Sequence, residues 1–143
     1  MGENTLSSNR QEAYLMEREQ LLALAREAAQ KAHCPYSHFR VGAALVAGGE
    51  VFTGVNIEIS SYGLTLCAER SALATAVSHG AGPVTQVAVA CIDAPPSAPP
   101  GSRTPCGACR QWLSDLAPHA TIFIDGIEQN FTVSDLLPHA FEL

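Results

Sequence analysis

Residues 84–91 read VTQVAVAC, a stretch in which Val and Ala occupy nearly every position after Gln86. Strict alternation of apolar and polar residues predicts a strand with one wet face, whereas a continuous apolar run predicts a strand that is buried on both faces. A strand of the second kind needs a covering layer on each side. Residues 84–91 therefore predict an inner strand of a sheet that is covered on both faces.

Helical segments lie on both sides of this strand along the chain. Residues 67–80, CAERSALATAVSHG, are rich in Ala and Leu and end at Gly80, which is typical of a helix with a glycine stop. Residues 93–103, DAPPSAPPGSR, contain too much proline and glycine for regular structure and predict a loop. After this loop, a helix is expected to begin at the cysteines of residues 105–109 and to continue through RQWLSDLA.

The N-terminal part of the chain predicts a helix followed by a hairpin. Residues 11–33 predict an amphipathic helix, because apolar residues recur at helical spacing. These residues are Leu15, Leu22, Ala25, Ala29 and Ala32. Proline breaks the pattern at residue 35, and the apolar runs 41–46 and 51–52 then flank Gly48-Gly49, which predicts a β-hairpin.

The C-terminal part predicts two more strands, at residues 121–124 and 131–133, with Ser134 as the N-cap of a short closing helix. The complete order of elements is α, β, β, α, β, α, β, β, α. This alternation favours an α/β sandwich with a central sheet.

The composition predicts one folded domain. The 143 residues are too few for two ordinary domains, and 47% of them are hydrophobic whereas 15% are charged. We expect a single domain over residues 1–143, with residues 1–10 flexible. So few charged side chains also favour a surface that is partly covered by other copies of the chain.

The charge and the hydropathy of the chain argue against nucleic acids and membranes as binding partners. The net charge of −6 comes from 14 acidic and 8 basic residues, and Lys and Arg form no cluster that could neutralise phosphates. The N-terminal residues lack the apolar core of a signal peptide, and no later stretch is apolar enough to span a bilayer. We expect a cytoplasmic protein that binds neither nucleic acid nor membranes. In a reducing compartment its five cysteines are thiols or metal ligands rather than disulfides.

Cys106 and Cys109 form a C-x-x-C pair at the start of a predicted helix. This spacing presents two thiolates to one point in space, as a zinc site requires. The pair could instead be a redox motif, but a thioredoxin-like site is expected after the first strand of its fold and not after a proline-rich loop. A metal site is therefore the favoured interpretation.

Cys67 also opens a predicted helix, so two helix N-termini can bring three thiolates to one ion. Three sulfur ligands leave one position open, which is typical of catalytic rather than structural zinc. Cys34 or Cys91 could close the site, but neither belongs to a ligand pair, and both are interpreted as buried core thiols. The histidines also lack partners at ligand spacing and are assigned to the surface or the core. They are His33, His38, His79, His119 and His139.

Glu69 stands two residues after Cys67, where a carboxylate can touch a metal-bound water without binding the metal. Taken alone, a glutamate in a first helical turn is only a favourable charge near the helix dipole. The combination of C-x-E with P-C-x-x-C favours a catalytic role for this glutamate, because the same pattern with H-x-E in place of C-x-E is the signature of zinc-dependent base deaminases. Glu69 is therefore the predicted general acid and base.

Cys67 replaces the histidine of that signature, so three thiolates surround one Zn²⁺ and form a cluster with net negative charge. Such a charge would weaken the acidification of the bound water. Arg70 is adjacent to Glu69 and is the obvious nearby cation. We expect Arg70 to donate a hydrogen bond to a ligand thiolate and so to offset the charge.

Further motifs accompany the cysteines. In chain order they are Pro35-Tyr36-Ser37, Phe39, Val41-Gly42-Ala43-Ala44, Asn56-Ile57-Glu58, Tyr62, Cys67-Ala68-Glu69-Arg70, Pro105-Cys106-Gly107-Ala108-Cys109-Arg110-Gln111 and Leu136-Leu137-Pro138. Through them the chain resembles the small homotetrameric cytidine deaminases from about Cys34 to Phe141. The resemblance implies a three-layer α/β/α sandwich with a central mixed sheet and one Zn²⁺ per chain. It also implies a hydrolase of pyrimidine salvage that converts cytidine and deoxycytidine to uridine and deoxyuridine with release of ammonia.

The same resemblance implies that Asn56 and Glu58 hold the ribose 3′-hydroxyl of the nucleoside substrate. The residue types support this independently. An amide and a carboxylate two residues apart on an extended segment face the same side, and together they can bracket one hydroxyl. The alternative interpretation of this segment is a polar loop.

The remaining substrate-binding positions are aromatic or small. The resemblance matches Phe39 to the ring that packs on the base, and Phe141 to a C-terminal aromatic that a neighbouring subunit of the homotetramer contributes to a shared active site. From the residues alone, both would be interpreted as core or tail residues. Tyr62 and Ala68 are the other implied contacts. One departure is Ile59-Ser60-Ser61, where many members have Asn-Ala after the N-x-E.

Two other functions use part of the same pattern. A deaminase of another cytosine compound, such as a nucleotide or a blasticidin-type antibiotic, would need the same zinc site, although Glu58 would repel a phosphate. A non-catalytic module stabilised by zinc would need Cys34 or Cys91 as the fourth ligand.

Overall fold

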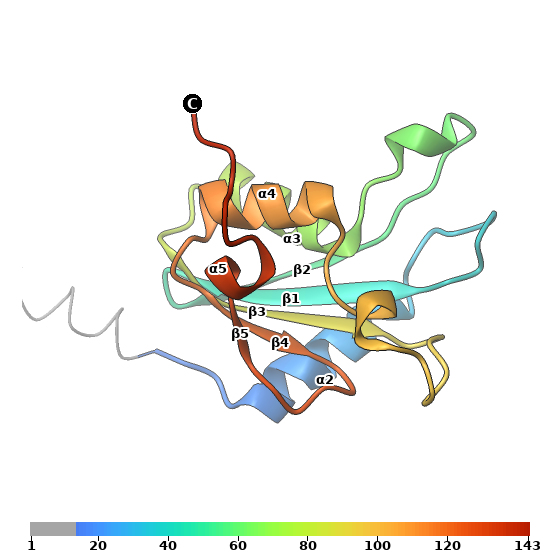
Figure 1. Cartoon of the computed structure of the whole chain (residues 1–143), viewed down its shortest axis with the longest axis horizontal. Helices are drawn as coiled ribbons and strands as arrows, with labels where there is room; N and C mark the ends of the chain where they lie inside the picture. The colour runs from blue at the N-terminus through green and yellow to red at the C-terminus, as the bar shows by residue number, and fades with distance from the viewer. Residues whose placement is uncertain (1–13) are drawn as a thin grey trace, which may run out of the picture.

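The computed structural model describes residues 14–143; residues 1–13, which include the predicted flexible residues 1–10 and the beginning of the predicted first helix, lie outside the described part. Five strands form one mixed sheet in the order β2-β1-β3-β4-β5 (Figure 1). They are β1 (Val41–Ala47), β2 (Glu50–Val55), β3 (Val84–Cys91), β4 (Thr121–Ile124) and β5 (Phe131–Thr132). The strand that residues 84–91 predict is thus the middle strand of the sheet.

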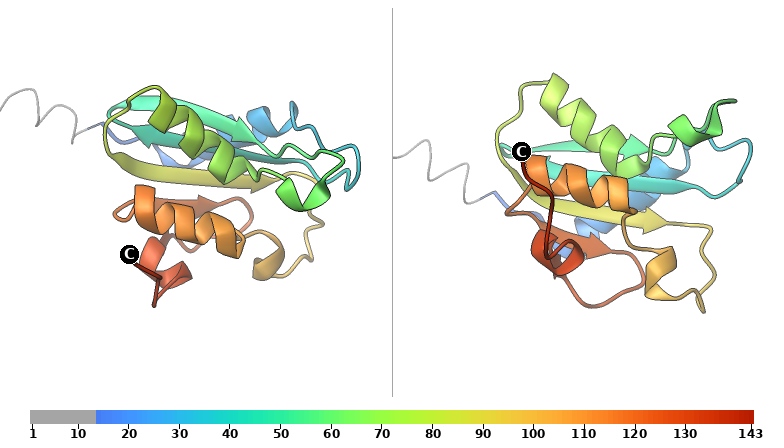
Figure 2. Two further views of the ribbon diagram at one scale, coloured as in Figure 1. Left: turned by 90° about the horizontal axis from the view of Figure 1, so that it is seen from above. Right: turned by 45° about the horizontal axis from the view of Figure 1, so that its top comes forward.

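Helices cover both faces of the sheet, so the fold is the predicted three-layer α/β/α sandwich (Figure 2). Helix α2 (Arg18–Ala29) packs on one face, and α3 (Ala68–Ser78) and α4 (Gly107–Leu116) lie side by side on the other. The shorter elements are η1 (Tyr62–Leu64), η2 (Pro100–Ser102) and α5 (Val133–Leu136). Within residues 14–143, no helix has the length and apolar character needed to cross a membrane.

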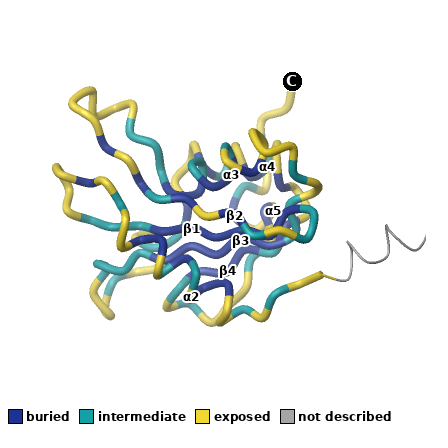
Figure 3. The backbone as a smooth tube through the Cα atoms, turned by 180° about the vertical axis from the view of Figure 1, so that it is seen from behind, coloured by how far each residue is buried: buried dark blue, intermediate teal, exposed yellow. Residues whose placement is uncertain are grey.

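The two faces of the sheet form two separate cores, and Figure 3 shows β1, β3 and β4 as mostly buried. Successive residues of a strand point to opposite faces. Leu45 and Val87 accordingly join the core under α3 and α4, whereas Val46 and Ala88 join the core under α2. Residues 84–91 lack polar alternation because both of their faces are covered.

Strand directions determine which ends of the elements meet. Strand β1 is antiparallel to both β2 and β3, so β2 and β3 run in the same direction and finish at the same end of the sheet. The segments that follow them, which contain η1 and η2, extend from this end together with the turn that precedes β1 (Figure 1). Strand β4 is parallel to β3 and β5 is antiparallel to β4, which makes the sheet mixed, as expected.

The first helix is shorter than the predicted span of residues 11–33, and Leu15 is not on it. Helix α2 begins at Arg18, and Leu15 is 61% exposed. The cause is a pair of hydrogen bonds from another element, because the side-chain amide of Gln86 accepts from Met16 N at 2.9 Å and donates to Met16 O at 2.9 Å. These bonds hold the chain before Arg18 in a non-helical path along the sheet.

Thr132, and not the predicted Ser134, caps the closing helix. The Thr132 hydroxyl accepts a hydrogen bond from Asp135 N at 3.1 Å, and the Asp135 carboxylate accepts one from Thr132 N at 2.8 Å. This reciprocal pair is a capping box, which a serine one residue into the helix cannot form. The last strand correspondingly ends at Thr132, and Val133 is already helical.

Two glycines bring helices unusually close to the sheet. A Cβ atom on Gly42 would lie 1.9 Å from Ala25 O of α2, and a Cβ atom on Gly54 would lie 2.6 Å from Ala68 O and 2.3 Å from Ala72 N of α3. In both places the added atom would clash with helix backbone, which cannot move aside by changing rotamer as a side chain can. Gly54 therefore determines how closely the first turn of α3 approaches the sheet.

Replacement of Gly42 by Ala is expected to reduce the free energy of unfolding by about 1–3 kcal/mol, because α2 must shift to accommodate the methyl group. Gly63→Ala is the matched control, since a Cβ atom there meets nothing within 4 Å, and its effect should stay within about 0.5 kcal/mol. Denaturant unfolding monitored by circular dichroism measures both variants. Equal stability of the two variants would contradict the close approach of α2.

Candidate active site

Three cysteines from two helices meet at the end of the sheet where β2 and β3 finish. Cys67 is the N-cap residue of α3, Cys106 is the N-cap residue of α4, and Cys109 lies in the first turn of α4. Both helices begin at this end because each follows a strand that finishes there. The positive ends of two helix dipoles are therefore directed at one place, which favours negatively charged ligands.

The three sulfur atoms have the spacing of a metal site. Sγ of Cys67 lies 3.8 Å from Sγ of Cys106, which lies 3.5 Å from Sγ of Cys109, and all three atoms are within 4.8 Å of one another. Zinc–sulfur bonds of about 2.3 Å in a tetrahedron place neighbouring sulfurs about 3.8 Å apart. The cysteines thus fit zinc as they stand. Among the described residues no fourth Cys, His, Asp or Glu belongs to this group.

The cluster already favours a thiolate. Hydrogen bonding with the neighbouring Cys109 thiol, helped by Arg70, lowers the pKa of Cys67 to about 5. The pKa of Cys109 is raised, because it hydrogen-bonds to that thiolate and is buried. A thiolate is the form of cysteine that binds a metal.

Glu69 lies in the first turn of α3, next to the cysteine cluster but outside it. The residue is only 4% exposed, and this burial raises the pKa of its carboxyl group to about 7. A carboxyl group with a pKa near neutrality can both accept and return a proton under physiological conditions. The position and environment of Glu69 are those that a general acid and base needs.

Arg70 also contacts the cysteine cluster. Its Nη2 lies 3.3 Å from Sγ of Cys67 and 3.1 Å from the carbonyl oxygen of Thr65. Its Nε is buried without a hydrogen-bond partner in residues 14–143. A buried, unpaired donor costs free energy, so a negatively charged cluster beside it is favoured.

A cavity of about 270 Å³ opens beside the cysteines. Six of the predicted catalytic and substrate-binding side chains line it: Phe39, Asn56, Glu58, Tyr62, Ala68 and Glu69. The turn before β1, the segment after β2 and the first turn of α3 bring them together. The cavity therefore brings the carboxyl group of Glu69 together with an amide–carboxylate pair, Asn56 and Glu58, and all three residues are almost fully buried.

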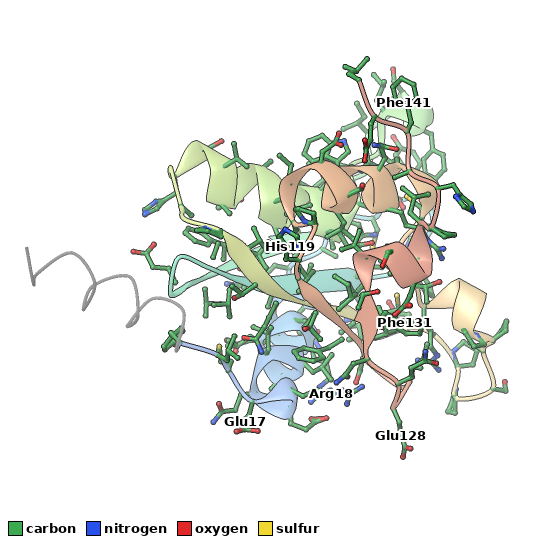
Figure 4. The ribbon with its side chains drawn as sticks, turned by 60° about the vertical axis from the view of Figure 1, so that its left-hand side comes forward. Glu17, Arg18, His119, Glu128, Phe131 and Phe141 are labelled. Carbon is green, nitrogen blue, oxygen red and sulfur yellow. The ribbon has the colours of Figure 1, made fainter. Side chains whose placement is uncertain are left out.

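Phe141 lies outside this cavity. Its side chain is 68% exposed at the end of the C-terminal tail, and Figure 4 shows it beyond α4, away from the sheet. The tail is held there by a hydrogen bond of 3.0 Å from Gln111 Nε2 to Phe141 O. The predicted role of Phe141 requires a second copy of the chain.

Several lining residues were not among the predicted site residues. Cys91, interpreted from the sequence as a core thiol, is half-buried and lines the cavity, and burial together with the nearby Glu69 raises its pKa to about 12. Ser37 and Thr65 also line it. The sequence did contain one indication of this position: Cys91 is the last residue of its strand, and the strand finishes at the end of the sheet where the three clustered cysteines lie. Cys34 is buried, as interpreted.

The sequence around this cluster matches a known family of zinc enzymes. Residues 15–125 match the family described as "Cytidine and deoxycytidylate deaminase zinc-binding region", and this range contains all three cysteines and Glu69. The chain belongs to the cytidine and deoxycytidylate deaminase family. The metal of this deaminase is therefore zinc, and Cys67, Cys106 and Cys109 form a cluster that is able to bind it.

Individual deaminases are similar over most of the chain. Cytidine deaminase of Halalkalibacterium halodurans is 45% identical over 131 residues, which cover 88% of this chain and 95% of that protein. Cytidine deaminase of Mycobacterium tuberculosis is 44% identical over 120 residues, covering 83% and 85%. The crystal structure of cytidine deaminase from Burkholderia pseudomallei has a TM-score of 0.77 at 41% identity and covers 88% of this chain and 100% of that chain.

The purified deaminase is expected to hold one zinc ion per chain, and Cys109→Ala should abolish that retention, because two thiolates are too few to keep the ion. The double variant Cys34→Ala/Cys91→Ala is the control and should keep its zinc. Elemental analysis after dialysis measures both proteins. Loss of zinc from the double variant would show that one of those thiols closes the site and would exclude an open fourth position.

Proposed function

We propose that this chain hydrolyses cytidine and deoxycytidine to uridine and deoxyuridine and releases ammonia. The observation that carries the proposal is one cavity whose lining includes Glu69, two cysteines of the metal-binding cluster, Asn56 and Glu58. The carboxyl group and the cysteines suit hydrolysis at a base, and the amide–carboxylate pair suits a sugar hydroxyl. Relatives of similar length that bear the name cytidine deaminase support the same substrate.

The chemistry divides between the metal and the carboxyl group. Zinc, when bound, supplies a Lewis acid that makes water a nucleophile near neutral pH. The carboxylate of Glu69 accepts a proton from the attacking water and delivers it to N3 of the cytosine ring. It then takes the proton of the new C4 hydroxyl and passes it to the amino group, which leaves as ammonia while the C4 carbonyl forms. Its burial keeps bulk water away from this transfer, and its pKa of about 7 allows both directions.

The other residues hold the nucleoside. Asn56 and Glu58 bind a sugar hydroxyl, and Phe39 packs on the base, with Tyr62 and Ala68 as further contacts. Glu58 also disfavours a nucleotide, because its carboxylate would repel a phosphate. A nucleoside without a phosphate is therefore the substrate class.

The protein acts in the cytoplasm as a homotetramer with shared active sites. None of its described cysteines forms a disulfide, as expected in a reducing compartment. Several large apolar side chains are exposed on the isolated chain, which favours association with other copies. They are Tyr36, Tyr62, Leu64, Val77, Trp112 and Phe141. In this assembly Phe141 of one chain closes the cavity of another.

Glu69→Gln should lower the rate of deamination by roughly 10²–10⁴-fold and leave zinc retention and folding unchanged, because the amide keeps the shape but cannot carry the proton. Glu27→Gln, in α2 on the opposite face of the sheet, should retain normal activity. Release of ammonia from a panel of cytidine, deoxycytidine, cytidine monophosphate and blasticidin S gives the readout. Near-normal turnover by Glu69→Gln would rule out the proposed mechanism.

Arg70→Ala should lower kcat/KM for cytidine by about 10–100-fold, because the ligand thiolates lose a hydrogen bond and the compensating charge. Arg26→Ala is the matched control, because this arginine lies in α2 and pairs with Glu19 and Asp125 rather than with a cysteine. Rates across pH and zinc content are measured together. Unchanged activity of Arg70→Ala at every pH would contradict the charge-compensating role.

A further inference from the structure

The turn before β1 encloses the carboxylate of Glu58. Its Oε1 accepts hydrogen bonds from the backbone N–H groups of Tyr36 at 3.1 Å and Ser37 at 3.0 Å, and its Oε2 accepts one from the Ser37 hydroxyl at 2.6 Å. Glu58 is 3% exposed. Three donors from two consecutive residues therefore hold one nearly buried carboxylate.

The Ser37 hydroxyl has a fixed direction. Its oxygen accepts a hydrogen bond from Phe39 N at 3.1 Å, and its proton is donated to Glu58. The hydroxyl thereby connects the residue that binds the sugar with the residue that packs on the base. The pKa of Glu58 is lowered first by the Ser37 hydroxyl, then by the backbone N–H groups of Ser37 and Tyr36, and by the nearby His38.

The backbone of this turn carries strain at His38. This residue has φ of +56°, the left-handed region, which no other non-glycine residue in the described part of the chain adopts. Its N–H closes the turn on the carbonyl oxygen of Cys34 at 2.9 Å. A non-glycine residue in this conformation is strained and persists only where other contacts require it. The three bonds to Glu58 are such contacts.

Asn56 is fixed in a similar way beside Glu58. Its Oδ1 accepts from Val41 N at 2.9 Å, and its Nδ2 donates to Phe39 O at 2.7 Å. One N–H of the Asn56 amide and one acceptor position on Oε2 of Glu58 are left over. A single hydroxyl group accepts one hydrogen bond and donates one. The pair is therefore complementary to one hydroxyl and to no group that lacks a proton to donate.

We propose that Ser37 is a positioning residue, whose hydroxyl orients the Glu58 carboxylate so that its one free acceptor position faces the sugar hydroxyl of the substrate. Ser37 thus determines the preference for nucleosides that carry this hydroxyl. The proposal rests on the function proposed above. Ser37 acts through Glu58 and takes no part in the chemistry at the base.

The test compares cytidine with 3′-deoxycytidine, which lacks the hydroxyl, in Ser37→Ala and in the conservative Ser37→Thr. For Ser37→Ala, KM for cytidine should rise roughly tenfold with kcat nearly constant, since a hydrogen bond to a charged group is lost from binding. The KM for 3′-deoxycytidine should change less than twofold. Ser37→Thr keeps the hydroxyl, and because Ser37 is exposed, its extra methyl group has room; it should restore the cytidine KM to within about twofold.

The outcomes separate this proposal from the function on which it depends. Equal losses for both nucleosides in Ser37→Ala, or failure of Ser37→Thr to restore KM, would reduce Ser37 to a purely structural role and overturn the proposal. Absence of ammonia release from either nucleoside by the unmodified, zinc-loaded enzyme would instead overturn the proposed function. Circular dichroism melting of each variant confirms that the kinetic differences come from folded protein.

Discussion

The convergence of two helix N-termini on one point is the constraint on which the rest of this structure depends. Cys67 at the start of α3 and Cys106 at the start of α4 can share an ion only because β2 and β3 finish at the same end of the sheet. The close approach of α3 at Gly54 fixes one side of the cluster. The helix dipoles make the same point favourable for anionic sulfur, so topology and electrostatics agree.

Most of the fold could be predicted from the sequence, because periodicity reports burial directly. Residues 84–91 are apolar throughout since α2 covers one face of β3 and α3 and α4 the other. The start of the first helix could not be predicted, because the side chain of Gln86, far away in the sequence, takes the backbone groups of Met16. Such competition from a distant element leaves no trace in local spacing.

The site residues that lie in short sequence motifs could be predicted, whereas contacts between distant segments could not. C-x-E and P-C-x-x-C indicate Cys67, Glu69, Cys106 and Cys109 within short windows. Ser37 meets Glu58 because residues around His33 and Ile57 form a bridge between segments that lie more than twenty positions apart, and spacing alone does not reveal that contact. The role predicted for Phe141 stays a prediction, since its expected partner lies on another chain.

The separation of the zinc ligands along the chain has a consequence for how the protein folds. Between Cys67 and Cys106 the chain must complete α3, insert β3 beside β1, and return through the proline-rich loop. Until that insertion is complete, Cys67 is not held beside Cys106 and Cys109 at the distances that this structure shows. Zinc binding at the complete three-sulfur site is therefore coupled to formation of the whole sheet, and it stabilises the chain as a whole rather than one helix.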